Sequence, residues 1–174
     1  MKTLIVYYSL EGNTRMIAEK LAEKTGADLL EIRSVKKYPA KGPAKFIIGG
    51  KDAAFKVCPE IEKTDMNMKA YDAVVFGTPV WDGTIAPPLR SFMRDIIVKN
   101  PVVAAYACMA GKDPKKTFDV IKELACVDSL AAEVSFYSPA AGNDPDVDSK
   151  IDQLAAILQL SLAAAYIVVL LTAM

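Results

Sequence analysis

The chain has 174 residues, of which 52% are hydrophobic, enough for one compact domain with its own core. Lys plus Arg and Asp plus Glu both number 21, so no basic surplus indicates a nucleic acid partner. The chain has no histidine, which excludes histidine catalysis and a His-ligated metal site. The spacing of Cys58, Cys108 and Cys126 fits no redox pair or iron–sulfur cluster, and no signal peptide precedes the first predicted strand. These features indicate a cytoplasmic protein with free thiols.

The N-terminal third predicts a β-α-β unit. Residues 3–8 form a short run rich in β-branched and aromatic side chains, which is typical of a buried strand. Residues 14–24 place apolar side chains on one helical face, with Arg15 and Glu19 spaced for an ion pair on the other. Gly26 is expected to end this helix, and residues 27–33 form a second strand. The order of these elements predicts parallel pairing of the two strands.

Residues 34–70 carry the least regular pattern. They contain loop signals, then a predicted helix at 44–57 that Gly49 and Gly50 are expected to interrupt. Lys36 and Lys37 lie in a basic loop that is interpreted as solvated surface in preference to a docking site for a partner.

The rest of the chain continues the alternation of strands and helices. Strands are predicted at residues 71–77, 101–108 and 130–137, with helices at 87–99 and 113–125 between them. The pattern predicts an α/β fold, a doubly wound three-layer sandwich with a five-stranded parallel sheet in the order 2-1-3-4-5, over residues 1–160.

The last helix begins amphipathically and then becomes apolar on every side. No charge follows Asp152, and residues 161–174 form an apolar C-terminal tail. Its length reaches the threshold for a membrane span, although few flanking Lys or Arg residues support one. Three interpretations stay open. The favoured one is packing on the domain or on the partner of a homodimer, and the others are a membrane anchor and a tail that departs from the natural sequence.

Small and polar residues follow the first predicted strand and lead directly into a helix. The first turn of a helix has unpaired backbone N–H groups and the positive end of the helix dipole, so an anion can bind there. A phosphate-binding loop is therefore predicted, against the alternative of an ordinary helix cap. A carboxylate beside a phosphate would repel it, so the Glu11 side chain is expected to point away. The predicted loop consists of Ser9, Leu10, Glu11, Gly12, Asn13 and Thr14.

Two further loops are predicted at the same edge, because the carboxyl ends of parallel strands meet there. The second loop contains the single tryptophan of the chain, and the third is a small turn that contains glycine. The second loop comprises Thr78, Pro79, Val80, Trp81, Asp82 and Gly83, and the third comprises Cys108, Met109, Ala110 and Gly111.

The pattern Ser9-x-x-Gly12-Asn13-Thr14 resembles the FMN-phosphate loop of flavodoxins. The segments 77–81 and 107–111 resemble the second and third flavin loops of that family, so that the likeness covers about residues 2–160. The resemblance implies FMN as cofactor, with Trp81 against one face of the isoalloxazine. It also implies that the peptide after Trp81 turns its carbonyl toward N5–H when the ring gains one electron.

The sequence departs from the family pattern at three places. Glu11 stands where a hydroxyl residue is usual, and Asp82 separates Trp81 from Gly83. No aromatic residue lies between Met109 and the next helix, so Met109 covers the second face of the ring or that face is open.

Three functions are consistent with these patterns. The favoured one is a flavodoxin-like carrier of single electrons on non-covalently bound FMN, serving redox partner proteins that the sequence does not identify. The second is an FMN-dependent NAD(P)H or quinone oxidoreductase, which an open ring face would suit. The third is a flavin-free interaction domain.

Overall fold

The computed structural model describes residues 2–40, 42–96, 98–100, 102–111 and 113–172. The predicted strand start at Pro101 and the last two residues of the predicted tail lie outside this range. The strands are β1 (Thr3–Tyr7), β2 (Asp28–Glu31), β3 (Ala73–Trp81), β4 (Thr84–Ile85), β5 (Val102–Met109) and β6 (Glu133–Tyr137). The helices are α1 (Asn13–Thr25), α2 (Pro43–Ala54), α3 (Pro87–Arg94), α4 (Lys115–Ala125) and α5 (Val147–Thr172), with short 3-10 turns at Met68–Ala70 and Pro139–Ala141.

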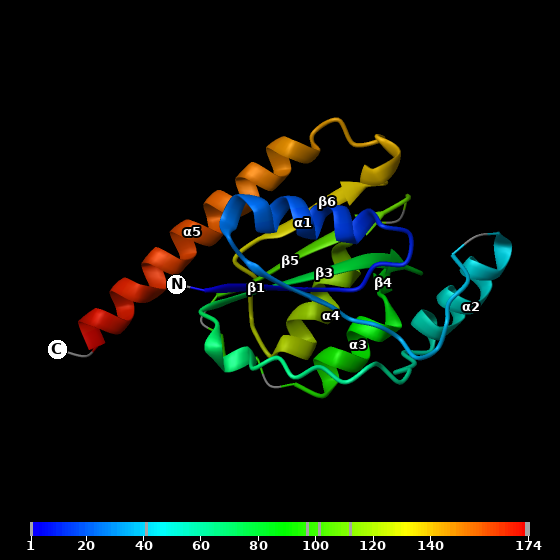
Figure 1. Cartoon of the computed structure of the whole chain (residues 1–174), viewed down its shortest axis with the longest axis horizontal. Helices are drawn as coiled ribbons and strands as arrows, with labels where there is room; N and C mark the ends of the chain where they lie inside the picture. Colours follow the sequence, from blue (N-terminus) through cyan, green and yellow to red (C-terminus); the bar gives the residue numbers. More distant parts are fainter. Residues whose placement is uncertain (1, 41, 97, 101, 112, 173–174) are drawn as a thin grey trace.

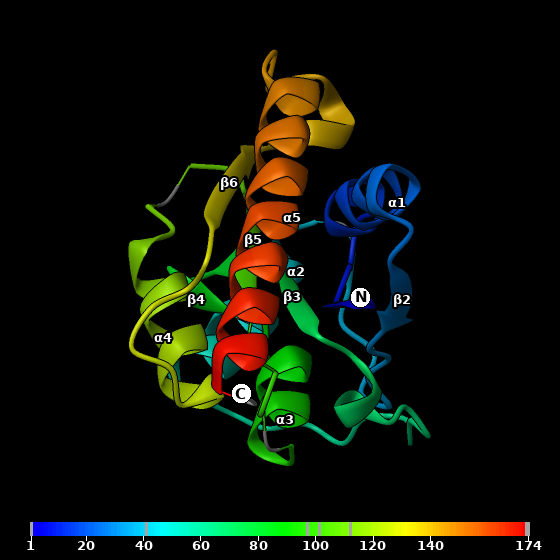
Figure 2. The same ribbon diagram turned by 90° about the vertical axis from the view of Figure 1, so that its left-hand side faces the viewer.

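The five long strands form a parallel sheet in the order β2-β1-β3-β5-β6. Helices α1 and α5 cover one face of this sheet, and α3 and α4 cover the other (Figures 1 and 2). The predicted doubly wound three-layer fold is therefore confirmed, and its predicted strand order 2-1-3-4-5 corresponds to the observed order of the parallel strands. The short strand β4 is an addition, since it pairs with β3 in the antiparallel direction.

The segment predicted as the second loop is largely a β-hairpin. Strand β3 continues to Trp81, which pairs with Thr84 across a two-residue turn. The turn residues Asp82 and Gly83 both have positive φ, 49° and 75°. This conformation matches the twist of a hairpin, and Asp-Gly is one of the residue pairs that favour it. The hairpin fixes the backbone of Trp81, which a free loop would not do.

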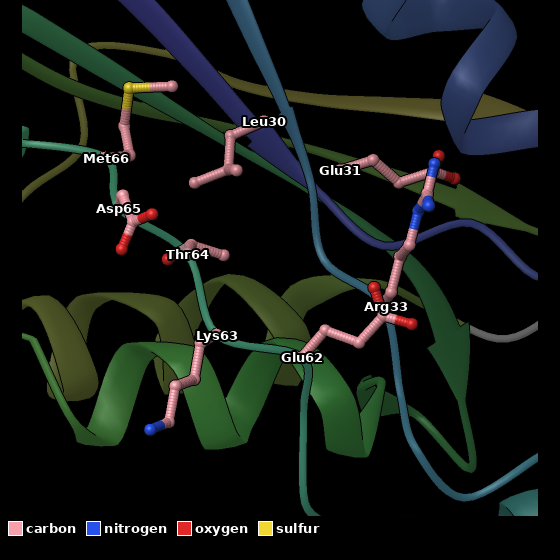
Figure 3. Close-up of a pocket in the computed structure, with 8 residues that line it drawn as sticks. All are labelled: Leu30, Glu31, Arg33, Glu62, Lys63, Thr64, Asp65 and Met66. Carbon is pink, nitrogen blue, oxygen red and sulfur yellow. The ribbon is translucent and has the colours of Figure 1, made fainter.

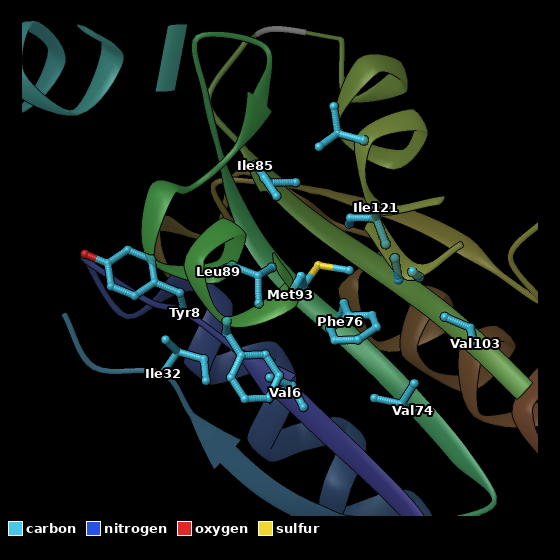
Figure 4. Close-up of a cluster of buried hydrophobic side chains, with 14 of the residues drawn as sticks. Val6, Tyr8, Ile32, Val74, Phe76, Ile85, Leu89, Met93, Val103 and Ile121 are labelled. Atoms are coloured by element: carbon cyan, nitrogen blue, oxygen red, sulfur yellow. The ribbon is translucent and has the colours of Figure 1, made fainter. Parts of the chain in front are cut away.

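Strand residues alternate between two buried layers. In β1, Leu4 and Val6 face α3 and α4, whereas Ile5 faces α1 and α5. Figure 4 shows the first layer, where side chains of β1, β3, β4 and β5 meet those of α3 and α4. Because both faces of the central strands β1, β3 and β5 are covered, most of their positions carry apolar residues.

Helix α2 is uninterrupted, so the predicted break at the glycine pair is wrong. Gly49 packs against Trp81, and a Cβ atom at Gly49 would lie 3.0 Å from two atoms of the Trp81 ring. Glycine costs a helix interior about 1 kcal/mol relative to alanine, and here it permits close contact between helix and ring. Figure 1 shows α2 beyond the carboxyl edge of the sheet, on neither of its two faces.

Several predicted boundaries and one predicted ion pair differ from the structure. The helix predicted to reach residue 99 ends at Arg94, and the strands predicted at 27–33 and 130–137 are shorter. Arg15 forms an ion pair with Glu31 on β2, and Glu19 is not its partner. Arg15 thus pairs with a residue of strand β2 and not with a residue of its own helix.

Helix α5 packs on the domain only along its first part. Ile151 and Leu158 are buried against α1 and the sheet, and Leu162 is the last residue of this buried row. Farther along, Tyr166 and Leu171 are 56% and 69% exposed, and Figure 1 shows these turns projecting past the edge opposite α2. By length and composition alone, the 22 residues Val147–Val168 could cross a membrane, and 28% of their most apolar window is buried.

Candidate functional site

The sheet brings the three predicted segments to one edge. Strand β3 lies between β1 and β5, with Tyr7 paired to Gly77 and Pro79 paired to Cys108. Because all three strands are parallel, their carboxyl ends point the same way. The loop after β1, the hairpin at the end of β3 and the turn after β5 are therefore neighbours, as predicted.

The first loop offers a row of backbone donors. Helix α1 begins after Gly12, whose φ of 92° suits glycine, and no side chain caps the helix there. The Ser9 hydroxyl accepts a hydrogen bond from the Arg15 N–H at 3.2 Å, and Asn13 Oδ1 accepts one from the Ala140 N–H at 2.9 Å. The backbone N–H groups of residues 10–14 donate to no acceptor among the described residues. Together with the positive end of the α1 dipole, they form an environment for an anion.

Glu11, the unexpected residue of this loop, has a basic partner. Its carboxylate lies 2.7 Å from Lys45 Nζ, on α2. A partly exposed pair of this kind contributes up to about 1 kcal/mol to stability. Its larger effect is on the local field, because Lys45 offsets the negative charge that would repel a phosphate.

The side chains of Thr14 and Cys108 lie in the interior, between the sheet and α1. Thr14 is buried, and its carbonyl accepts a hydrogen bond of 2.8 Å from the hydroxyl of Tyr106. Burial raises the pKa of the Cys108 thiol to about 12, against the smaller opposite effect of its hydrogen bond with Thr14. These two predicted site residues thus contribute structure, and only their backbones remain for a ligand.

Trp81 is held by aromatic neighbours that the sequence analysis did not identify. Its ring makes edge contacts with Tyr8 at 5.8 Å and with Tyr38 at 5.0 Å between centroids. Thr78 stabilises the start of the hairpin. Its hydroxyl accepts a hydrogen bond from the Ala86 N–H at 3.0 Å and donates one to the Pro79 carbonyl. The tryptophan therefore stands in an ordered aromatic cluster at the predicted edge.

Contacts of Lys36 and Tyr38 with Asp52 connect α2 to this cluster. The Tyr38 hydroxyl donates to Asp52 Oδ2 at 2.8 Å, and Lys36 forms an ion pair with the same carboxylate. Burial, followed by this contact with Asp52, raises the pKa of Tyr38 well above its ordinary value. Burial alone would raise the pKa of Asp52, but hydrogen bonds from Lys36 and Tyr38 lower it. The signal in the sequence was the basic and aromatic composition of 34–42, which alone does not specify this geometry.

A sequence model described as flavodoxin matches residues 2–131. The chain belongs to the flavodoxin family. Its structure is similar to that of a flavoprotein from Lactobacillus acidophilus in complex with FMN, with 27% sequence identity and a TM-score of 0.66 over 86% of this chain and 97% of that chain. It also shares the fold of oxidised flavodoxin 2 from Bacillus cereus, with 16% identity and a TM-score of 0.56 over 94% of this chain and 99% of that chain.

Two surface hollows border the β2 side of this flavodoxin domain. One, of about 500 Å³, lies between β2 and residues 62–66 (Figure 3), carries charges of both signs and contains none of the predicted site residues. The other, of about 410 Å³, adjoins the first loop and shares Ser9 with it. The hairpin and the third loop line neither hollow, and in the third loop Met109 is half-buried while Ala110 and Gly111 are exposed.

Proposed function

We propose that this protein binds FMN non-covalently at the carboxyl edge of the sheet and carries single electrons between redox partner proteins of the cytoplasm. The observation that carries the proposal is the row of unused backbone N–H groups at residues 10–14, at the same edge as Trp81. Membership of the flavodoxin family and the FMN complex of the Lactobacillus neighbour support it.

The residues present fit FMN. Backbone N–H groups of residues 10–14 would hold the phosphate, and Lys45 offsets the charge of Glu11. Trp81 would supply an aromatic surface for the ring, and its contacts with Tyr8 and Tyr38 limit how far it can turn. Bound FMN would supply the capacity for one-electron and two-electron transfer.

The turn after Trp81 also fits the proposal. Asp82 and Gly83 already have positive φ values, so a peptide rearrangement here would not have to force Asp82 out of an ordinary conformation. Aspartate tolerates this region better than most residues, and glycine adopts it without cost. The order of these two residues, which departs from the family pattern, is therefore compatible with a mobile carbonyl.

The test is stepwise anaerobic reduction of the purified protein with FMN added, followed by visible absorbance. A long-wavelength band that rises and then falls is expected for a one-electron carrier. Direct bleaching would favour the two-electron oxidoreductase. Failure to retain any flavin would overturn both functions and leave the interaction domain.

Variants of Trp81 and Thr14 test where the flavin binds. Trp81→Ala is expected to weaken FMN binding and shift its potentials, whereas Trp81→Phe retains an aromatic surface and most of the affinity. Thr14→Ala is expected to weaken FMN more than riboflavin, because it disturbs the loop that only the phosphate contacts. Unchanged values for Trp81→Ala would remove Trp81 from the site, and equal losses for the two flavins would refute the phosphate-loop assignment.

The oxidoreductase is retained as the second candidate function because of one observation. The hollow of about 410 Å³ beside the first loop is strongly basic, which would suit a second, anionic substrate. A flavin carrier needs no such site.

A further inference from the structure

Positive charge is concentrated in one segment of the chain. Residues 33–58 contain seven cationic residues and one acidic residue, a net charge of +6 by sequence, in a chain whose total is zero. The remaining residues therefore carry −6. The seven are Arg33, Lys36, Lys37, Lys41, Lys45, Lys51 and Lys56.

Part of this charge lines the hollow of about 410 Å³. Arg15, Arg33, Lys36 and Lys37 line it, and Glu31 is the one acidic residue that does so, which leaves a net lining charge of +3. Glu31 is neutralised by Arg15. Lys36 is paired with Asp52, but Arg33 and Lys37 form no ion pair with any described residue. Two cations are thus available to a ligand, and no acidic side chain in the lining is unpaired.

The same hollow contains a polar atom without a partner. The Ser34 hydroxyl oxygen is buried and makes no hydrogen bond with any described residue. This oxygen has almost no accessible surface, so a ligand that occupies the hollow as it stands does not contact it. The aromatic side chains of Tyr8 and Tyr38 form another part of the wall. Cations and aromatic rings together correspond to the phosphate and the base of a nucleotide.

We propose that this hollow is a second ligand site, which binds a phosphorylated nucleotide beside the flavin. Its volume lies within the range of about 300–1,000 Å³ that is usual for small-molecule sites. It adjoins the flavin edge, because Ser9 and the two tyrosines that contact Trp81 line it, but the hairpin and the third loop do not. The proposal rests on the proposed function in one respect, the assignment of FMN to the adjacent edge.

The test is calorimetric titration of the full chain, saturated with FMN, with ADP, adenosine and pyrophosphate as probes. ADP is expected to bind at least tenfold more tightly than adenosine, because adenosine lacks the phosphates. ADP is also expected to bind more tightly than pyrophosphate, because pyrophosphate lacks the base. Equal affinity for ADP and pyrophosphate would overturn the assignment to a nucleotide.

Variants of the lining residues test whether ADP binds in the hollow. Arg33→Gln combined with Lys37→Gln removes the two unpaired cations, and ADP affinity is expected to fall at least tenfold while FMN affinity stays within twofold. Lys116→Gln is the matched control, since Lys116 is an exposed lysine on α4, away from the hollow, and this variant is expected to bind ADP as the unmodified chain does. Equal loss in the control would mean a general charge effect and would overturn the proposal.

Competition separates this proposal from the flavin assignment. If ADP displaces FMN, the hollow belongs to the flavin site and the proposal fails, although the proposed function survives. If the protein retains no flavin, the same titration on the flavin-free chain still tests the hollow. Absence of ADP binding in both forms would overturn the second site.

Discussion

Among the glycines, Gly77 has the least room for a Cβ atom because Tyr106 lies against it, and this supports a quantitative prediction for Gly77→Ala. A Cβ atom at Gly77 would lie 2.2 Å from Tyr106 Cζ and 2.3 Å from its hydroxyl oxygen. Tyr106 has no exposed surface and packs edge-on against Phe136, with 6.2 Å between the ring centroids. The ring has no free space to move into, so the substitution must displace buried structure.

The magnitude follows from two terms. Overpacking a filled core costs about 1–3 kcal/mol, and the upper end applies because the displaced group is a fully buried ring. Displacing the ring also breaks the hydrogen bond of 2.8 Å from the Tyr106 hydroxyl to the Thr14 carbonyl, worth about 1 kcal/mol. Gly77→Ala should therefore lower the free energy of unfolding by about 4 kcal/mol, a large part of the usual 5–15 kcal/mol.

Urea unfolding measures this loss. With a denaturant slope of about 2 kcal/mol per molar, the midpoint should fall by about 2 M. Gly50→Ala is the matched control, because its Cβ would meet nothing within 4 Å and alanine should stabilise α2 by about 0.5–1 kcal/mol. In a Tyr106→Ala background the cost of Gly77→Ala should shrink below about 1 kcal/mol. An unchanged midpoint for Gly77→Ala, or an equal cost in both backgrounds, would refute the reasoning.

Three further outcomes are expected. Burial alone would raise the pKa of Asp144, but hydrogen bonds from Lys150 and two backbone N–H groups lower it. Ionised Asp144 therefore stabilises the fold above its unfolded pKa, and this contribution is lost as the pH falls through its folded pKa. Asp144→Asn should therefore reduce the acid-side slope of stability in urea titrations from about pH 7 to about pH 3. Maleimide should label exposed Cys126 but spare buried Cys108 until urea unfolds the protein, as mass spectrometry would show. Leu171→Gln should change stability by no more than about 0.5 kcal/mol, because the side chain is 69% exposed, and should reduce self-association in sedimentation if this turn meets a second copy.

The layers of the fold could be predicted because they depend on local periodicity. The central strands are largely apolar runs, and apolar faces mark the helices between them, so the order of elements determined the architecture. The edge at which the three predicted segments meet followed from the same order. The hairpin was missed although Asp82-Gly83 is a recognisable turn pair, because the predicted strand ended at residue 77 and the residues after it were assigned to a loop.

Residues 34–70 resisted prediction because long-range contacts determine their structure. Tyr38 contacts Trp81, and Lys45 contacts Glu11, across 43 and 34 positions of the chain. Gly49 appeared to break a helix because the pattern did not reveal the ring that packs against it. Thr14 and Cys108 were assigned to the site from their positions, whereas strand alternation and the start of α1 turn their side chains inward.

Glu11 and the basic segment are best understood together. A carboxylate in the proposed phosphate loop is unfavourable by itself, and a segment of net charge +6 is unfavourable by itself through repulsion among its cations. Placing α2 over the carboxyl edge brings Lys45 to Glu11 and Lys36 to Asp52, and so reduces both costs. Arg33 and Lys37, which form no ion pair with any described residue, line the hollow of about 410 Å³, where the field they create favours an anionic ligand. The departure from the family pattern in the loop and the charge of a distant segment are thus two parts of one electrostatic arrangement.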